Sequence, residues 1–372
     1  MIHRRRLLAG FAAAPALAAL PRLAFAQDNA AQADAALDAT FAQHAPPAMI
    51  SAVVGRGGVV WSGVRGVRRT GQPEAATTDD LWHLGSNGKA MTAALYAKLV
   101  EQGRARWDAP LSSLFPDLTL APGYAEATID DLLRHRAGID DRQAVTREVL
   151  IAGHQDQRPI REQRTAFAAD LLGKAPTGQR GAFAYSNAGY ALAGAAIERL
   201  TDQSWEDAIR AHLFAPMGAA SVGFGAPLGD NPWGHRAMGE VLTAVDPARG
   251  ADNPALLGPA GRMHMTLADY ARFLRLYLND GDGQLSPATM TRLVTPPEGT
   301  PPPYAYGWGA STPPWAQGTA LAHEGSNTMW HAIAVVAPAR GLAVVSIAND
   351  RVKGGPANQA MARALTGIFA PT

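Results

Sequence analysis

Strand-like stretches of the chain lie near its two ends, and helix-like stretches fill the middle. Runs of β-branched and small apolar residues, joined in pairs by glycine- or proline-containing turns, occupy residues 49–54, 59–64, 330–336 and 342–347. Each pair predicts a β-hairpin, because two such runs on either side of a tight turn can pair as neighbouring strands. Shorter extended segments are predicted over 81–84 and 304–309.

Apolar residues recur at helical spacing through the middle of the chain. Capping-box patterns, in which an acid follows a hydroxyl side chain by three positions, predict helix starts at Thr128, Ser204 and Thr266. Further helices are predicted over 27–45, 86–102 and 356–369. The apolar stripe of 27–45 is weak, so we expect this helix to pack late or loosely. Residues 221–262 are rich in Gly, Pro and Asn and predict a long loop at the rim of a site.

This order of elements predicts an α/β (α+β) fold with two lobes. The strands from both chain ends are expected to form one mixed antiparallel sheet that is flanked by the terminal helices. A mainly helical lobe is then inserted between them. The expected boundaries place the sheet lobe at about 46–104 and 300–370 and the helical lobe at about 105–295. We expect the chemistry in the cleft between the lobes.

The first 26 residues have the pattern of a signal peptide. A basic start is followed by an alanine-rich apolar stretch over 7–20 and by Ala24-Phe25-Ala26, which is typical of a cleavage site. The Arg4-Arg5 pair before Leu7-Leu8 indicates the twin-arginine export route. The apolar stretch is too short to span a bilayer comfortably. We therefore expect a periplasmic or secreted protein with no stable membrane insertion after cleavage.

Composition and charge narrow the classes of function. The chain has no cysteine, which excludes disulfides, zinc–thiolate sites and a lipoprotein anchor. Removal of residues 1–26 would take away four arginines and no acids, and would leave 29 basic and 32 acidic residues. Such a balance does not indicate a nucleic-acid partner. His323-Glu324 lacks the second histidine that a zinc helix needs, so we expect no metal and no cofactor. The oligomeric state is not indicated.

A lysine close to a serine is the strongest chemical signal. The chain has 29 arginines and only four lysines, and Lys89 lies three positions after Ser86. An arginine stays charged at any workable pH, whereas an amine can lose its proton. Three positions apart on a helix, the two side chains share one face. A neutral Lys89 can then take the proton of Ser86 as the hydroxyl attacks a carbonyl.

Two further polar segments complete a recognisable set. Tyr185-Ser186-Asn187 precedes an apolar helix, and His323-Glu324-Gly325 lies just before Ser326 near the end of the chain. Ser-x-x-Lys, then Tyr-x-Asn, then a three-residue box ending in Gly resembles the serine β-lactamase and penicillin-binding-protein family. The resemblance is to the class C β-lactamase and D-alanyl-D-alanine carboxypeptidase branch in particular. It covers about 46–370 and implies the two-lobe fold of that family.

The resemblance also implies roles for these residues. Ser86 is the expected nucleophile, and Lys89 is expected to be the base or the group that keeps a neighbouring base ionised. Tyr185 is expected to share the role of base, which requires a nearby cation such as Lys89 to lower the pKa of its phenol. Asn187 is expected to hold Lys89 and to bind a substrate amide. The backbone N–H groups of Ser86 and Ser326 are expected to donate to the oxyanion. Taken alone, Tyr185 and Asn187 are better interpreted as a core aromatic beside a helix-capping amide; together with the other boxes they favour catalysis.

The third box departs from the β-lactamase pattern. Where that branch has Lys-Thr-Gly, whose lysine binds a substrate carboxylate, this chain has His323-Glu324-Gly325. A histidine is mostly neutral at pH 7, and Glu324 is expected to face the other side of its strand. The resembling esterases and aminopeptidases often carry a histidine here. We therefore expect His323 and Gly325 to border a site for a small ester, amide or peptide-like substrate without an essential carboxylate.

Two alternatives remain open. The first is a true β-lactamase or D-alanyl-D-alanine carboxypeptidase. The second, of a different class, is a sensor domain that is acylated, or merely binds its ligand, without turnover. Other residues are expected to be structural or to line the cleft. The histidines expected to be structural are His83, His135 and His264. Trp233 and His235 are expected at the rim, and Trp330 and Tyr306 are either walls of the acyl pocket or sheet core.

Overall fold

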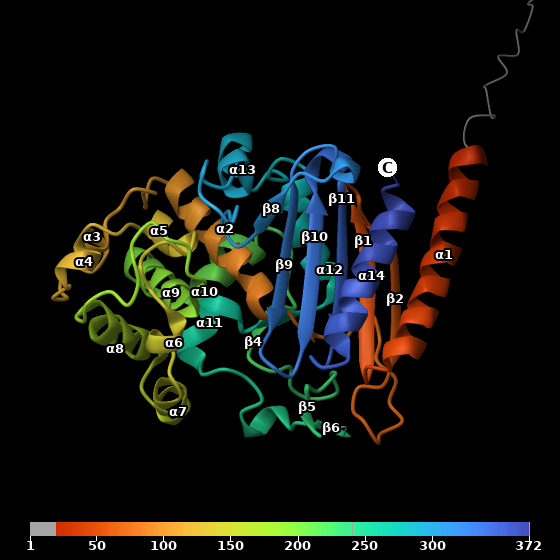
Figure 1. Ribbon diagram of the computed structural model, residues 1–372, viewed down its shortest axis with the longest axis horizontal. Helices are drawn as coiled ribbons and strands as arrows, with labels where there is room; N and C mark the ends of the chain where they lie inside the picture. The colour runs from red at the N-terminus through yellow and green to blue at the C-terminus, as the bar shows by residue number, and fades with distance from the viewer. Residues whose placement is uncertain (1–19, 240, 372) are drawn as a thin grey trace, which may run out of the picture.

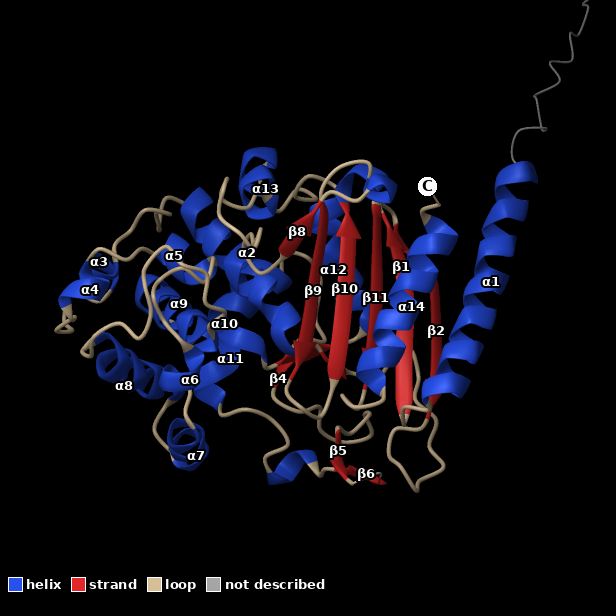
Figure 2. Ribbon diagram, viewed as in Figure 1, coloured by secondary structure: helices blue, strands red, loops and turns tan. Residues whose placement is uncertain are grey.

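The computed structural model describes residues 20–239 and 241–371. Its centre is a six-stranded antiparallel sheet in the order β2-β1-β11-β10-β9-β8 (Figure 2). The strands are β1 (Ala48–Gly55), β2 (Gly58–Gly66), β8 (Gly309–Ser311), β9 (Ala320–Ser326), β10 (His331–Ala337) and β11 (Leu342–Ala348). Most of the predicted signal peptide lies outside the described residues.

Both predicted hairpins are confirmed, as is the sheet built from the two chain ends. β1 pairs with β2 and β10 with β11, and the two hairpins join where Ile50 lies opposite Ile347. The strand predicted over 304–309 is wrong: β8 begins only at Gly309. Gly307 has φ 86°, which breaks an extended course, and any side chain there would collide with the backbone of Ala90.

Helices cover both faces of this sheet (Figure 1). α1 (Leu20–His44) and α14 (Gly354–Phe369) pack on one face, whereas α12 (Leu267–Leu278) packs on the other. Side chains alternate between the faces: Val53 of β1 belongs to the core under α1 and α14, and Val54 to the core on the α12 side.

The expectation that the first helix packs loosely is wrong. Ala33 and Leu37 of α1 are fully buried against the sheet, and the Trp61 indole donates to Asp34 at 3.2 Å. The apolar stripe of this helix is weak because alanines, among them Ala30, Ala33 and Ala36, occupy the face that contacts the sheet. Their small side chains let the helix approach the strands closely. A weak stripe therefore did not indicate weak packing.

The middle of the chain is mostly helical, as predicted. The capping side chains of Thr128, Ser204 and Thr266 each accept a hydrogen bond from the backbone three positions on. The α-helices between β3 (Trp82–His83) and α12 are α2 (Gly88–Glu101), α3 (Leu111–Leu114), α4 (Pro122–Ala125), α5 (Ile129–Leu133), α6 (Asp141–Ala144), α7 (Arg147–Gln155), α8 (Ile160–Leu172), α9 (Asn187–Thr201), α10 (Trp205–Ile209) and α11 (Gly258–Gly261). α13 (Pro287–Val294) follows α12. The proposed lobe boundaries remain a prediction.

The segment predicted as one long loop contains several short elements. They are β4 (Gly223–Phe224), β5 (His235–Met238), β6 (Val241–Ala244), η3 (Pro247–Arg249), η4 (Ala255–Leu257) and α11. β4 joins β3 (Trp82–His83) and β7 (Met263–Met265) in a small sheet. Strands of two to four residues are too short to produce a periodic pattern, so composition alone suggested a loop. Within the described residues, no helix has the length and apolar character that crossing a membrane requires.

Candidate active site

Ser86 lies in a tight turn between β3 and α2. The turn is a 3-10 segment, η1 (Gly85–Asn87), so the helix begins slightly later than predicted. Gly85 has φ 53°, a left-handed conformation that glycine adopts without strain. The backbones of Gly261 and Gly325 press against this turn: a carbon added at either would lie 2.9 Å or 2.7 Å from the Ser86 nitrogen. Glycine at both positions lets α11 and β9 hold the serine.

Lys89, in the first turn of α2, brings its amine to the serine. Its Nζ lies 3.1 Å from the Ser86 Oγ, 2.7 Å from the Asn187 Oδ1 and 2.7 Å from the Ala260 carbonyl oxygen. The side chain is fully buried. Burial lowers the pKa of Lys89 to about 7, and the charge of Asp141 acts in the opposite direction. At neutral pH a substantial fraction of this amine is unprotonated.

Tyr185 stands over the amine, with its ring centre 4.7 Å from the Lys89 Nζ. The residue is 38% exposed, yet burial of its hydroxyl end raises the pKa of the phenol, and a hydrogen bond with Ser86 only partly offsets this. The expectation that Lys89 lowers the phenol's pKa is therefore wrong. The lysine meets the face of the ring and is itself only partly charged, so desolvation prevails. Tyr185 is a neutral phenol.

Asn187 is the first residue of α9, with Ser186 as its cap. Asp141, which the sequence analysis did not single out, closes this helix end: its carboxylate accepts from the Asn187 N–H at 2.6 Å, the Ala188 N–H at 3.0 Å and the Ser186 hydroxyl at 2.9 Å. These contacts aim the Asn187 amide at Lys89. Only the fold joins α6 to α9, so no spacing in the sequence could have revealed Asp141.

His323 lies on the face of β9 that carries Gly325, toward Ser86. The hydroxyl of Tyr304 lies 3.1 Å from its Nε2 and 3.2 Å from the Nε2 of His135. Burial and the charge of Lys89 lower the pKa of His323 to about 3. The third box therefore presents a neutral ring where a β-lactamase has a cation. Ser326 follows, and its amide nitrogen lies against Gly85.

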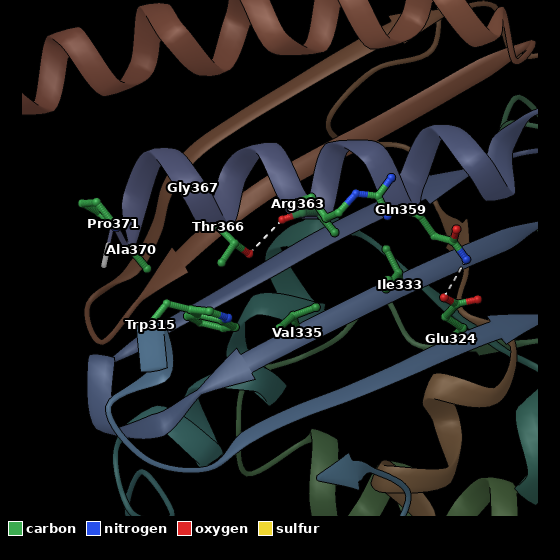
Figure 3. A pocket seen from close by; sticks show the side chains of 11 residues that line it. Trp315, Glu324, Ile333, Val335, Gln359, Arg363, Thr366, Gly367, Ala370 and Pro371 are labelled. Carbon is green, nitrogen blue, oxygen red and sulfur yellow. Dashed lines mark hydrogen bonds between the residues drawn. The ribbon is translucent and has the colours of Figure 1, made fainter. Parts of the chain in front are cut away.

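Glu324 faces the opposite side of the sheet, as strand alternation predicts. It contacts His331 at 3.2 Å and Gln359 at 2.9 Å, and it lines a groove of about 650 Å³ between α14 and β10 (Figure 3). Ile333 and Val335 form the floor of this groove. The sheet separates the groove from Ser86, and the described residues that line it include no serine or cysteine. It is therefore not our candidate for the chemistry.

The remaining aromatic and histidine candidates are mostly structural. Trp330 and Tyr306 are fully buried and belong to the core rather than to an open pocket wall. His235 is also buried, and its Nδ1 contacts the Asn349 carbonyl oxygen at 2.9 Å. The prediction that His235 lies at the rim is therefore wrong. Trp233 is partly exposed beneath the guanidinium of Arg69.

The structure thus brings together the residues of all three boxes. Ser86, Lys89 and Asn187 are joined by direct hydrogen bonds, and Tyr185 closes over them. The Ser326 backbone borders the same turn. His323 lines the site but is already engaged with Tyr304.

Known proteins resemble this chain in sequence. Penicillin-binding protein 4 of Amycolatopsis lactamdurans is 31% identical over 304 residues, which cover 77% of each chain. Unguisins hydrolase ungD′ of Aspergillus campestris is 27% identical over 318 residues, 77% of this chain and 55% of that protein.

Solved structures share the fold. The octameric penicillin-binding protein homologue from Pyrococcus abyssi superposes with a TM-score of 0.74 at 24% identity, covering 89% of this chain and 75% of that one. A D-stereospecific amidohydrolase from Streptomyces superposes with a TM-score of 0.71 at 21% identity, covering 92% and 99%. The family model described as Beta-lactamase matches residues 30–367. The chain therefore belongs to the Beta-lactamase family and is a hydrolase.

Proposed function

We propose that this protein is a serine hydrolase that cleaves an ester or amide through an acyl-enzyme on Ser86. The observation that carries the proposal is the buried amine of Lys89, 3.1 Å from the Ser86 Oγ, with a pKa lowered to about 7. A base is most effective when its pKa lies near the working pH.

The neighbours of Lys89 serve both protonation states of the amine. As an ammonium, its Nζ donates to the Ser86 Oγ, the Asn187 Oδ1 and the Ala260 carbonyl oxygen. As a neutral amine, it keeps two N–H donors for Asn187 and Ala260 and turns its lone pair to the Ser86 hydroxyl. As the Ser86 Oγ attacks the substrate carbonyl, its proton passes to Lys89. The Ser86 and Ser326 N–H groups then donate to the oxyanion.

The neutral phenol of Tyr185 supplies the next proton. When the tetrahedral intermediate collapses, the leaving alkoxide or amine takes the Tyr185 proton, and the proton held by Lys89 restores the phenol. Water then attacks the acyl carbonyl and gives a proton to the Lys89 amine. When this second tetrahedral intermediate collapses, the Ser86 Oγ takes that proton and the acid leaves, so that the Ser86 hydroxyl and the neutral amine are regenerated. This role requires a phenol that keeps its proton at working pH, which agrees with its raised pKa.

The wall formed by β9 argues for a substrate without an essential carboxylate. A neutral His323 offers no charge to an anionic group. Hydrolysis is supported by the unguisins hydrolase among the relatives, and an amide substrate by the D-stereospecific amidohydrolase whose solved structure shares the fold. Esters and D-amino-acid amides are therefore the substrates to examine first.

Labelling of Ser86 tests the proposal. A fluorophosphonate is expected to modify Ser86 in the purified protein, as located by peptide mass spectrometry, and Ser86→Ala is expected to lose both label and activity.

Lys89→Arg is expected to lower kcat/KM by about 10²–10⁴-fold, because a guanidinium cannot accept the proton. Lys353→Arg, at an exposed lysine, is the matched control. Full activity of Lys89→Arg would contradict the assigned base.

A substrate panel separates the alternatives. Short-chain p-nitrophenyl esters and D-amino-acid amides are expected to turn over faster than nitrocefin or D-alanyl-D-alanine peptides. Faster hydrolysis of nitrocefin would identify a β-lactamase instead. A label from fluorescent penicillin that never leaves Ser86 would identify a sensor.

Export is part of the proposal. The basic and apolar start of the chain supports transport through the twin-arginine route to the periplasm, with cleavage after Ala26. Mass determination of the protein recovered from the periplasmic fraction tests this location. An intact chain found only in the cytoplasm would contradict it.

A further inference from the structure

A buried carboxylate behind the catalytic turn belongs to none of the three motif boxes. Asp252 lies in the segment before η4 and is 8% exposed. It contacts two side chains from distant parts of the chain, His83 of β3 and Asn327 at the end of β9. His83 accepts from the N–H of Gly85, the residue before Ser86, and Asn327 directly follows Ser326. The N–H groups of Ser86 and Ser326 are the two that we assign to the oxyanion.

His83 links Asp252 to the turn that holds Ser86. The Gly85 N–H donates to the Nδ1 of His83 at 3.1 Å, and a backbone amide can only donate. The imidazole proton therefore lies on Nε2, which donates to the Asp252 Oδ2 at 2.8 Å. The ring is fully buried and stacks on Trp330 at 5.2 Å. Contacts with Gly85, Asp252 and Trp330 thus fix the position of the imidazole ring.

Asn327 links the same carboxylate to the Ser326 side. Its Nδ2 donates to the Asp252 Oδ1 at 2.8 Å. Its Oδ1 accepts from the N–H groups of Met329 and Trp330, each at 3.2 Å. The orientation of the amide is therefore settled by its partners, and the backbone next to Ser326 is held by the turn that follows β9.

We propose that Asp252 is a positioning residue whose carboxylate holds, through His83 and Asn327, the two backbone segments that carry the oxyanion donors. The inference rests on the proposed function, because it concerns the geometry of that site. Donors must lie within a few tenths of an ångström of their productive positions, and a misplacement of about 1 Å can lower the rate by about 10²-fold.

A carboxylate suits this place better than an amide. Besides His83 and Asn327, the Asn253 N–H donates to it at 2.8 Å, so acceptors are needed on both oxygens. Burial acts to raise the pKa of Asp252, but the contacts with His83, Arg262 and Asn327 outweigh it. The pKa of this carboxyl group is therefore lowered, and the group stays ionised. The guanidinium of Arg262, 3.5 Å away, balances the charge.

Asp252→Asn tests the proposal with little change in shape. One oxygen becomes an NH₂ group that faces the Nδ2 of Asn327, so the link to β9 is lost while that to His83 can remain. The concentration of active sites is first measured by titration with fluorophosphonate. On that basis, kcat for the best ester is expected to fall by about 10²-fold with little change in KM. The affinity for a boronic-acid transition-state analogue is expected to fall in parallel. Asp230→Asn, at a highly exposed aspartate, is the control and should change neither.

The reversed pair gives a rescue. In Asp252→Asn combined with Asn327→Asp, the new amide can donate to the new carboxylate, which still accepts from Met329 and Trp330. Activity is expected to recover by about tenfold, the effect of one charge-assisted hydrogen bond.

Three outcomes would overturn the role of Asp252. They are an unchanged kcat in Asp252→Asn, a loss of kcat without a loss of analogue affinity, and a double variant of unchanged melting temperature that is no more active than the single one. Retained activity in Ser86→Ala is a separate result, which contradicts the proposed function itself.

Discussion

A single buried amine sets the reactivity of the proposed site. Within the described part of the chain, no carboxylate forms a hydrogen bond with Lys89, and burial brings its pKa down to about 7. The charge of Asp141, which closes the end of α9, limits this shift. The balance between desolvation and one distant charge is therefore open to test by substitution.

Asp141→Asn is expected to move the acid limb of the pH profile. Lys89 acts when unprotonated, so kcat/KM of the wild type should rise with pH through about 7. Removing the negative charge disfavours the protonated amine and lowers its pKa, so the limb should shift to lower pH. The adjacent Asp140→Asn, at a carboxylate paired with Arg142, is the control. A shift to higher pH would contradict the assigned sign.

Tyr185→Phe is expected to distinguish substrates by their leaving groups. The variant cannot protonate a departing alkoxide or amine, so kcat for alkyl esters and amides should fall by about 10²–10⁴-fold. A p-nitrophenyl ester, whose leaving group departs readily without a proton, should lose much less. Steady-state kinetics with both substrate types provides the measurement. Equal losses would indicate that Tyr185 does not act as the acid.

Between elements, the site depends on how closely β9 approaches the η1 turn. Gly325 and Gly85 meet backbone to backbone, so that the Ser326 and Ser86 amides lie on neighbouring segments. β9 is held in the sheet by β10, where Glu324 lies opposite Ile333. The paired strand therefore acts as a rigid support for one half of the oxyanion site.

Gly325→Ala is expected to separate these two segments. Its methyl group would collide with the Leu84 carbonyl oxygen and lie 2.7 Å from the Ser86 nitrogen, so β9 must move away from the turn. We expect kcat/KM to fall by about 10²-fold or more while circular dichroism shows the sheet intact. Gly57→Ala, in the β1–β2 turn with open space around it, is the matched control. Wild-type activity in Gly325→Ala would contradict the close approach.

Across the whole molecule, stability and chemistry depend on different faces of the sheet. The smaller core under α1 and α14 includes Leu37, Trp61 and Met361, whereas the catalytic turn and its supports lie on the side of the larger core. The sheet stands between the two. A change beneath α1 should therefore alter the free energy of unfolding without altering the active site.

Leu37→Ala is expected to lower the free energy of unfolding by about 2–5 kcal/mol, because it removes a fully buried side chain and leaves a cavity. Urea denaturation provides the measurement, and kcat per folded molecule should not change. Gln32→Ala, at an exposed position of the same helix, is the control and should have little effect. An unchanged unfolding midpoint in Leu37→Ala would show that α1 contributes little to the core.

Local patterns predicted the parts of this protein that depend on local physics. The two hairpins, the caps at Thr128, Ser204 and Thr266, and the pairing of Ser86 with Lys89 each depend on residues a few positions apart. The short strands within 221–262 were missed, because two paired residues leave no periodicity. Tight packing of α1 was missed, because its alanines give no strong stripe.

The sequence by itself determined the order of the elements, the single sheet built from both chain ends and the three segments that meet at the site. Only the tertiary structure decided the protonation of that site. Burial lowers the pKa of Lys89 to about 7, keeps Tyr185 a phenol and leaves His323 neutral. The tertiary structure also brings Asp141 and Asp252 to the site, and neither belongs to a motif in the sequence. The reason is that a pKa depends on desolvation and on charges brought close by folding, and neither can be read from neighbours along the chain.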